Sequence, residues 1–272
     1  MGTASSSFLA RHEFLIRRLH SLSGLIPVGA YMVIHLLTNA SINNGPATFQ
    51  LAVYQIHSLG AVLPVVEWVF IFIPILFHAI IGVVIIRGGL PNSSAYPLPK
   101  NIRYTLQRAT GMIAFLFIVW HVFHMHGWIH AEAWEKNVAQ PLLGAQFKPF
   151  SAASTAAAAM QQSILIPILY GIGVLACVYH LANGIWTMGI TWGVWTSPAA
   201  QKRADKVCIG FGVLVAVVGL SAIGGFLRVK PQDAAKDEDK IYNAKVESGE
   251  LQPNPAKRSH SESAAEKTAL AD

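Results

Sequence analysis

The chain has 272 residues, of which 53% are hydrophobic and only 12% are charged, and its formal net charge is +6. Soluble domains carry about 25% charged residues, so the composition excludes an ordinary soluble domain and favours a membrane protein. The basic residues stand at the ends of apolar segments rather than in a stripe with aromatic residues, which argues against nucleic-acid binding. Cys177 and Cys208 lie outside any C-x-x-C pattern, so covalent haem attachment and a zinc knuckle are excluded.

Five stretches of the chain contain no Asp, Glu, Lys or Arg, and they comprise residues 19–66, 68–86, 109–131, 149–201 and 207–227. A membrane-crossing helix needs about 20 mostly apolar residues, so each stretch can hold one. We predict an all-α integral membrane protein, a four-helix bundle plus a fifth helix, with transmembrane helices over about residues 20–40, 61–87, 103–130, 161–191 and 207–227. The first apolar run is too long for a cleaved signal peptide and predicts a retained helix.

The segments between these helices predict loops. Asn, Gly, Pro and Ser mark residues 41–60 and 88–100, and residues 131–160 predict the longest loop, with a short surface helix. We assign residues 1–228 to one transmembrane domain and residues 229–272 to a polar, disordered tail, because the tail lacks apolar periodicity. Ten Lys and Arg residues flank the helix ends on the N-terminal side and two on the other, which predicts a cytoplasmic N-terminus in the cell membrane and a tail outside.

Each of the first four predicted helices carries one deeply placed histidine: His35, His78, His121 and His180. Ionisable residues are costly inside a bilayer and usually serve a function there. A single membrane histidine can be a packing or hydrogen-bonding residue, but one in each of four helices argues for a shared site.

The depth of each histidine follows from the helical rise of 1.5 Å per residue. His35 lies 17 residues after Arg18, roughly 25 Å from the inner edge, and His121 lies 18 residues after Arg103, roughly 27 Å from it. These two histidines therefore match in depth, near the outer face of the membrane.

The other two histidines match nearer the inner face. His78 lies 9 residues before Arg87, roughly 14 Å from the inner edge, and His180 lies 12 residues before Trp192, roughly 18 Å from it. Two pairs at two depths are typical of the axial imidazole ligands of two haem irons in a helical bundle. A zinc site would instead need four ligands at one depth.

Glycines near these histidines predict room for a flat macrocycle. Gly82 and Gly184 each follow a histidine by four residues, Gly173 precedes one by seven, and Gly24 precedes His35 by eleven. These spacings place each glycine near the face of its own histidine. Close helix packing by glycine is the alternative.

Four sequence blocks resemble one known family: RRLHSLSGLIPVGAYMVIH, PILFHAIIGV, QRATGMIAFLFIVWHV and YHLANGIWTMGITWG, which begin at residues 17, 74, 107 and 179. Their order and content are similar to the single-polypeptide, five-helix, di-haem cytochrome b membrane anchor of succinate dehydrogenases and fumarate reductases. The resemblance covers about residues 11–227.

This resemblance implies two haem b groups, the distal one held by His35 and His121 and the proximal one by His78 and His180. It implies an FAD-containing flavoprotein and an iron–sulfur subunit as partners, and electron transfer through the two haems to menaquinone or ubiquinone in the lipid bilayer. It also implies that this chain has no succinate site. Some relatives carry a glutamate two residues before the fourth ligand, where this chain has Val178, so a proton path through that position is in doubt.

Two further groups of residues are candidates for the site. Arg17, His20, Ser21 and Arg108 lie near the inner edge and could hold haem propionates, or could instead set topology and contact phospholipid.

Glu67, His57 and His124 lie near the outer edge and could serve a quinone or move protons, although Glu67 could equally be a solvated helix-end residue. His124 follows His121 by one turn and competes with it as a ligand, but its depth favours His121.

Two alternative functions remain open from the residues alone. One is the cytochrome b subunit of another respiratory enzyme, of the hydrogenase or formate dehydrogenase type, which also places haems between histidines. The other is a haem-free transporter with intramembrane histidines, for which broken helices and an internal repeat would be the signal.

Overall fold

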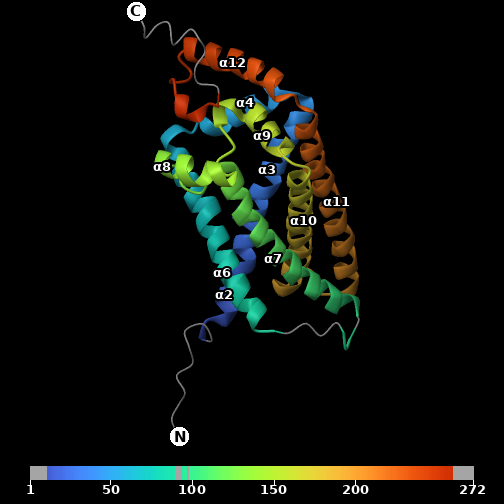
Figure 1. Ribbon diagram of the computed structural model, residues 1–272. Helices are drawn as coiled ribbons and strands as arrows, with labels where there is room; N and C mark the ends of the chain where they lie inside the picture. The colour runs from blue at the N-terminus through green and yellow to red at the C-terminus, as the bar shows by residue number, and fades with distance from the viewer. Residues whose placement is uncertain (1–10, 90–93, 97, 260–272) are drawn as a thin grey trace, which may run out of the picture. The chain divides into compact units, whose positions relative to one another are not determined.

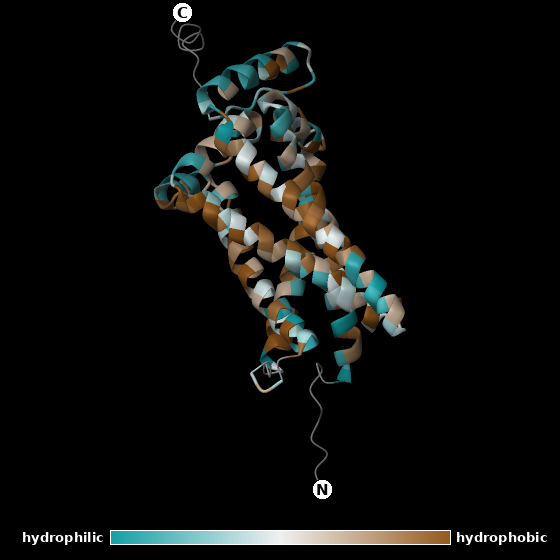
Figure 2. Cartoon of the chain, turned by 90° about the vertical axis from the view of Figure 1, so that its right-hand side faces the viewer, coloured by the Kyte–Doolittle hydropathy of each residue, from teal (hydrophilic) through white to brown (hydrophobic). Residues whose placement is uncertain are grey.

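The computed structural model describes residues 11–89, 94–96 and 98–259, and over these residues the chain forms helices and turns without a strand (Figure 1). Five helical stretches are long and apolar enough to cross a membrane: Glu13–Asn44, Gly60–Arg87, Pro99–His126, Leu165–Thr191 and Pro198–Arg228. Apolar residues run along these stretches (Figure 2). The predicted all-α fold with five transmembrane helices is therefore confirmed.

The first two spans are not regular α-helices throughout. The first consists of α2 (Glu13–Ser23), a π-helical turn (Gly24–Gly29), α3 (Ala30–Ala40) and a 3₁₀ turn (Ser41–Asn44). The second consists of a 3₁₀ turn (Gly60–Val62), α5 (Leu63–Glu67), a π-helical turn (Trp68–Phe72) and α6 (Ile73–Arg87). Pro27 lies inside the first π turn, where its missing N–H and its ring disturb the regular hydrogen-bond ladder.

The other three spans are continuous helices: α7 (Pro99–His126), α10 (Leu165–Thr191) and α11 (Pro198–Arg228). Both ends of α7 and the starts of α10 and α11 differ from the sequence prediction by four or more residues. α7 stops at His126 because Gly127 and Trp128 take φ values of +73° and +67°, which a right-handed helix cannot contain. α11 begins at Pro198 because a proline at the first helical position leaves no intrahelical hydrogen bond unmade.

The described residues group into two compact units. The first unit contains the described residues up to Ile34, with Pro64–Phe115 and Leu175–Ala216, and the second contains His35–Leu63, Leu116–Val174 and the described residues from Val217 onward. Within the first unit, α2 and the π turn after it pack on α6. A methyl group added at Gly29 would lie 2.6 Å from Leu181 Cδ1, so this glycine permits close packing of two helices.

The second unit contains three shorter helices that pack on one another: α4 (Pro46–His57), α9 (Ala152–Gln161) and α12 (Pro231–Glu247). The prediction of a loop over residues 41–60 is therefore wrong, because α4 begins at Pro46 and buries Phe49 and Val53. The short surface helix predicted within residues 131–160 agrees with the mostly exposed helical turns over residues 132–142, whereas α9 in the same stretch is buried. Its run of small alanines allows neighbours to approach it from several sides.

The prediction of a disordered tail is wrong for α12. Glu238 on this helix is 1% exposed and accepts hydrogen bonds from the main-chain N–H groups of Ala153 (2.6 Å) and Ser154 (3.0 Å) at the start of α9. The carboxyl oxygen of Glu238 satisfies N–H groups that have no intrahelical partner at the start of α9. This polar contact holds a helix whose sequence is mostly hydrophilic (Figure 2), which is why apolar periodicity gave no sign of it. Residues 260–272 lie outside the described part.

Candidate functional site

The first unit brings His78 on α6 and His180 on α10 together, with ring centroids 6.0 Å apart and planes at 87°. The Nδ1 atom of His78 lies 2.8 Å from the main-chain oxygen of His20, and Nδ1 of His180 lies 3.0 Å from that of Gln107. A carbonyl oxygen only accepts, so in both contacts Nδ1 carries the hydrogen and Nε2 keeps a lone pair. This is the tautomer of a histidine that binds a metal through Nε2 and is oriented through Nδ1.

A glycine makes each of these two contacts possible. Gly24 follows the His20 carbonyl by four residues, and a methyl group there would overlap the His78 ring. Gly111 follows the Gln107 carbonyl by four residues, and a methyl group there would lie 2.7 Å from Cε1 of His180. The imidazole therefore reaches a helical carbonyl only where the residue one turn later has no side chain.

Three of the glycines that were predicted to leave room for a macrocycle lie against protein side chains. Gly24 lies against the His78 imidazole rather than serving His35. The π turn Gly24–Gly29 takes additional residues into one turn, which shifts the face on which later residues of that span lie. A methyl group at Gly173 would overlap the ring of Phe117, and one at Gly82 would lie 3.4 Å from the ring of His20.

His20 itself stacks on His78, with ring centroids 4.0 Å apart and planes at 12°. The His20 ring thus covers one face of a predicted ligand, and propionate binding by His20 stays a prediction. Within the described ranges, no group of three or more His, Cys, Asp or Glu residues has a geometry that could hold a metal ion. Paired histidines with a planar tetradentate cofactor between them need no third protein ligand.

The second unit brings His35 and His121 together, with ring centroids 5.9 Å apart and planes at 72°. The Nδ1 atom of His121 lies 3.1 Å from the hydroxyl oxygen of Tyr170, and Phe117 stacks beside the His121 ring at 5.7 Å. Tyr170, on α10, is 7% exposed, so its hydroxyl is a fixed partner for the imidazole.

His124 shares the Tyr170 hydroxyl with His121. Its Nδ1 lies 2.9 Å from that oxygen, its ring stacks on Trp120 at 5.0 Å, and it is only 1% exposed. A hydroxyl donates one hydrogen bond and accepts others, so a donating Nδ1–H on His121 directs the hydroxyl hydrogen to His124. The remaining hydrogen of a neutral His124 is then on Nε2, which is buried and has no hydrogen-bond partner among the described residues.

Both pairs fit an iron held between two imidazoles. Two rings that approach one metal from opposite sides, each through a nitrogen at about 2 Å, have centroids about 6 Å apart. The centroid separations of 6.0 Å and 5.9 Å agree with that value. The hydrogen-bonded Nδ1 atoms of His78, His180 and His121 add the orienting partners that such ligands need.

The basic candidates for propionate binding have partners within the protein. Arg17 is exposed and pairs with Glu13 at 2.7 Å, one turn earlier on the same helix. The Ser21 hydroxyl accepts a hydrogen bond from the indole N–H of Trp192 at 3.1 Å.

Arg108 donates to the main-chain oxygen atoms of Ile85 (3.0 Å) and Gly89, and its guanidinium lies over the Tyr104 ring. It thus occupies the carbonyl groups left open at the end of α6. Propionate binding by these residues stays a prediction.

The remaining quinone and proton candidates belong to different units. Glu67, in the first unit, is half-buried and lies within electrostatic range of Tyr31. His57, in the second unit, ends α4, and its burial together with the nearby Lys257 ammonium lowers its pKa to about 4. A function for either residue stays a prediction.

Sequence reasoning missed the residues that orient the histidines, chiefly Gln107 and Tyr170. One signal was present: the spacing His20–Gly24 recurs as Gln107–Gly111, and a predicted ligand follows 11 residues after Gly24 and 10 residues after Gly111. The one-residue difference accompanies the π turn in the first span. The shared spacing indicates that each of the two helices uses a glycine to admit a histidine of a neighbouring helix and carries a predicted ligand of its own about three turns later.

Five apolar spans and two histidine pairs define a helical membrane protein with paired imidazoles inside its membrane-spanning segments. No protein-family model matches the chain. The chain is 33% identical over 215 residues to the succinate dehydrogenase cytochrome b558 subunit of Bacillus subtilis (strain 168). The matched region covers 79% of this chain and 98% of that relative. The chain therefore belongs to the family of succinate dehydrogenase cytochrome b subunits, and the resemblance carried by the four sequence blocks is confirmed.

Proposed function

We propose that this chain anchors a succinate dehydrogenase in the membrane and carries electrons from an iron–sulfur subunit to a membrane quinone. His78 and His180 hold one haem b, and His35 and His121 hold a second. The relative's name and the two histidine pairs at about 6 Å support this assignment.

The hydrogen bonds from Nδ1 of His78 and His180 to helical carbonyls are the single observation on which this proposal mainly rests. A packing histidine needs only one satisfied nitrogen of either kind, whereas an axial ligand needs Nε2 kept open and the ring held still. When bound, haem b supplies an iron centre that accepts and releases one electron. The chain's own residues orient the imidazoles, exclude water and set the charge around them.

The membrane orientation follows from the distribution of basic residues. We propose a cytoplasmic N-terminus and an external C-terminal segment, with the FAD-containing flavoprotein and the iron–sulfur subunit on the cytoplasmic side. The chain has no role in binding succinate in this arrangement.

His124 is our first candidate for contact with the quinone. It is buried beside Tyr170, and its Nε2 has no partner among the described residues. A buried nitrogen without a partner costs free energy unless a ligand or water satisfies it. Glu67 and His57 remain further candidates for the quinone or for proton transfer.

Purification of the complex through an affinity tag on this chain, from its own membranes, tests the proposal. We expect covalently bound flavin and iron–sulfur clusters to coelute, and added succinate to reduce the haem in the optical spectrum. Coelution of nickel or molybdenum without flavin would instead assign the chain to another respiratory enzyme. A colourless protein would contradict any cytochrome function.

A further inference from the structure

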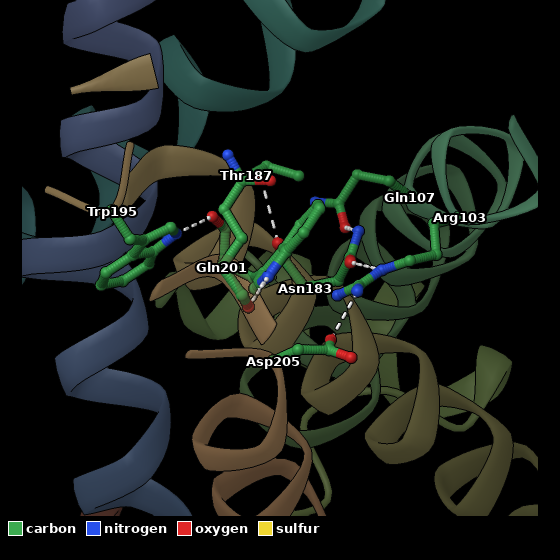
Figure 3. Close-up of polar contacts among 8 residues, drawn as sticks. Arg103, Gln107, Asn183, Thr187, Trp195, Gln201 and Asp205 are labelled. Atoms are coloured by element: carbon green, nitrogen blue, oxygen red, sulfur yellow. Dashed lines mark hydrogen bonds and ion pairs between the residues drawn. The ribbon is translucent and has the colours of Figure 1, made fainter. Parts of the chain in front are cut away.

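A continuous chain of polar side chains leads from Asp205 on α11 through Arg103 and Asn183 to Gln107 (Figure 3), and Gln107 contacts His180. Asp205 accepts a hydrogen bond from the Arg103 guanidinium, and Arg103 Nε donates to Asn183 Oδ1 at 2.8 Å. Asn183 Nδ2 then donates to Gln107 Oε1 at 2.7 Å, and Gln107 Nε2 donates to the main-chain oxygen of His180 at 3.1 Å. All five residues belong to the first unit.

The direction of this chain follows from chemistry. An arginine can only donate, so the atom of Asn183 that faces it is the oxygen, and the Asn183 nitrogen faces Gln107. The same logic turns the Gln107 nitrogen toward His180, where it lies 3.2 Å from Nδ1 as well as near the main-chain oxygen. Along the side chains of Arg103, Asn183 and Gln107, each donor therefore points toward His180.

Packing fixes the network in place. Asn183 is only 3% exposed, and the Arg103 guanidinium lies 3.9 Å from the ring centroid of Trp186. The Trp186 indole donates a hydrogen bond to the main-chain oxygen of Gln201 at 3.1 Å, so the ring beneath the guanidinium is also fixed to α11. Arg103 and Asp205 lie near the N-terminal ends of their spans and are 26% and 35% exposed, so their ion pair is partly shielded from water and is held in a defined place by these partners.

Gln107 holds His180 at two points. Its main-chain oxygen takes the Nδ1–H of the ring, and its side-chain amide holds the His180 main chain. Aligned hydrogen bonds polarise one another, so the positive charge of Arg103 acts along the chain toward the imidazole. Asp205 balances that charge by direct pairing.

We propose that the Asp205–Arg103–Asn183–Gln107 network is a positioning and charge-setting device that tunes the reduction potential of the haem held by His78 and His180. This inference rests on the proposed function. A positive charge near the iron favours the reduced form and raises the potential, and a negative charge lowers it. In the unaltered chain the network holds His180 in its orientation, and the charges of Arg103 and Asp205 balance each other.

Redox titration of the purified complex, followed optically, tests the inference with two opposed variants. Asp205→Asn leaves the charge of Arg103 without a partner, so we expect the midpoint potential of one haem to rise by about 59 mV. This shift corresponds to about a tenfold change in the equilibrium constant of a one-electron reduction. Arg103→Gln leaves Asp205 unbalanced, and we expect a shift of similar size in the other direction. The double variant returns close to the unaltered value, and Asp205→Glu, which keeps the charge, retains it.

Lys206→Gln is the matched control, because it removes an exposed charge next to Asp205 that has no place in the network. Equal shifts in this control and in Arg103→Gln, or shifts of the same sign in the two opposed variants, would overturn the inference, as would unchanged potentials for both haems. Haem content is measured first. An unaltered complex without haem would overturn the proposed function, whereas a complex with two haems and unresponsive potentials would overturn only the role of the network.

Discussion

Replacement of Gly111 by alanine is the sharpest test of how the chain positions a ligand. The new methyl carbon would lie 2.7 Å from Cε1 and 3.0 Å from Nδ1 of His180, whereas carbon atoms in contact lie about 3.5–4.0 Å apart. The imidazole must therefore move by about 1 Å. The contact of 3.0 Å between Nδ1 and the Gln107 oxygen would then exceed the range of a hydrogen bond.

The magnitude follows from these distances. Overpacking costs about 1–3 kcal/mol and the lost hydrogen bond about 1 kcal/mol more. Metal–ligand distances tolerate about 0.2 Å, so a displacement of about 1 Å is incompatible with an unchanged axial bond. We expect Gly111→Ala to lose one haem, or to retain it with altered low-spin features in electron paramagnetic resonance, and to lower the thermal stability of the complex.

Gly210→Ala provides the matched control, since Gly210 also lies in a membrane span of the first unit and a methyl group there would have no described neighbour within 4 Å beyond its own helix. Alanine favours helix by up to about 1 kcal/mol over glycine, so the control should be neutral or slightly stabilising. An unchanged haem content, spectrum and stability in Gly111→Ala would refute the reasoning that this glycine admits the ligand.

Three further predictions concern the second unit. Tyr170→Phe removes the hydroxyl shared by His121 and His124, so we expect a loss of about 1–3 kcal/mol in thermal unfolding and a changed resonance signal from one haem; an identical signal would argue that His121 is not oriented by Tyr170. Burial raises the pKa of Glu238 above 4.5, so protonation favours the docked α12 and its docking weakens as pH rises through the raised pKa; limited proteolysis should show this trend in the unaltered chain and not in Glu238→Gln. The pKa of His57 is lowered from 6.5 to about 4, so stability present above pH 6.5 falls as pH drops toward 4, and a melting curve of His57→Asn that keeps the full acid loss would contradict this cause.

The five spans and the histidine pairs could be predicted because they depend on simple quantities. Charge-free length identifies a membrane helix, and rise per residue places a histidine at a depth. The structure brings together the pairs that depth indicated, His35 with His121 and His78 with His180. Each pairing follows from one quantity, which is the depth of each histidine along the axis of its helix.

The orienting contacts could not be predicted in the same way. They depend on which face a helix turns toward its neighbour, and the π turns at Gly24–Gly29 and Trp68–Phe72 change that face. Gln107 and Tyr170 are ordinary helix residues in the sequence, and only the fold shows that their oxygen atoms meet imidazoles.

The misjudged segments share a different cause. α4, α9 and α12 share a buried apolar cluster that includes Phe49, Val53 and Met160, and polar contacts to distant segments add to this packing. Gln50 on α4 donates to the Pro149 oxygen at 2.8 Å and accepts from the Ala152 N–H at 2.7 Å. Such contacts join segments far apart in the sequence, so local composition carries no record of them.

A pyridine haemochrome assay on the purified complex shows whether each histidine pair holds one haem b. We expect two haems per chain, and one haem in each of the single variants His35→Ala, His78→Ala, His121→Ala and His180→Ala. His130→Ala, at an exposed position, should keep both haems. Absence of haem from the unaltered chain, or two haems retained in all four ligand variants, would mean that these pairs do not hold haem.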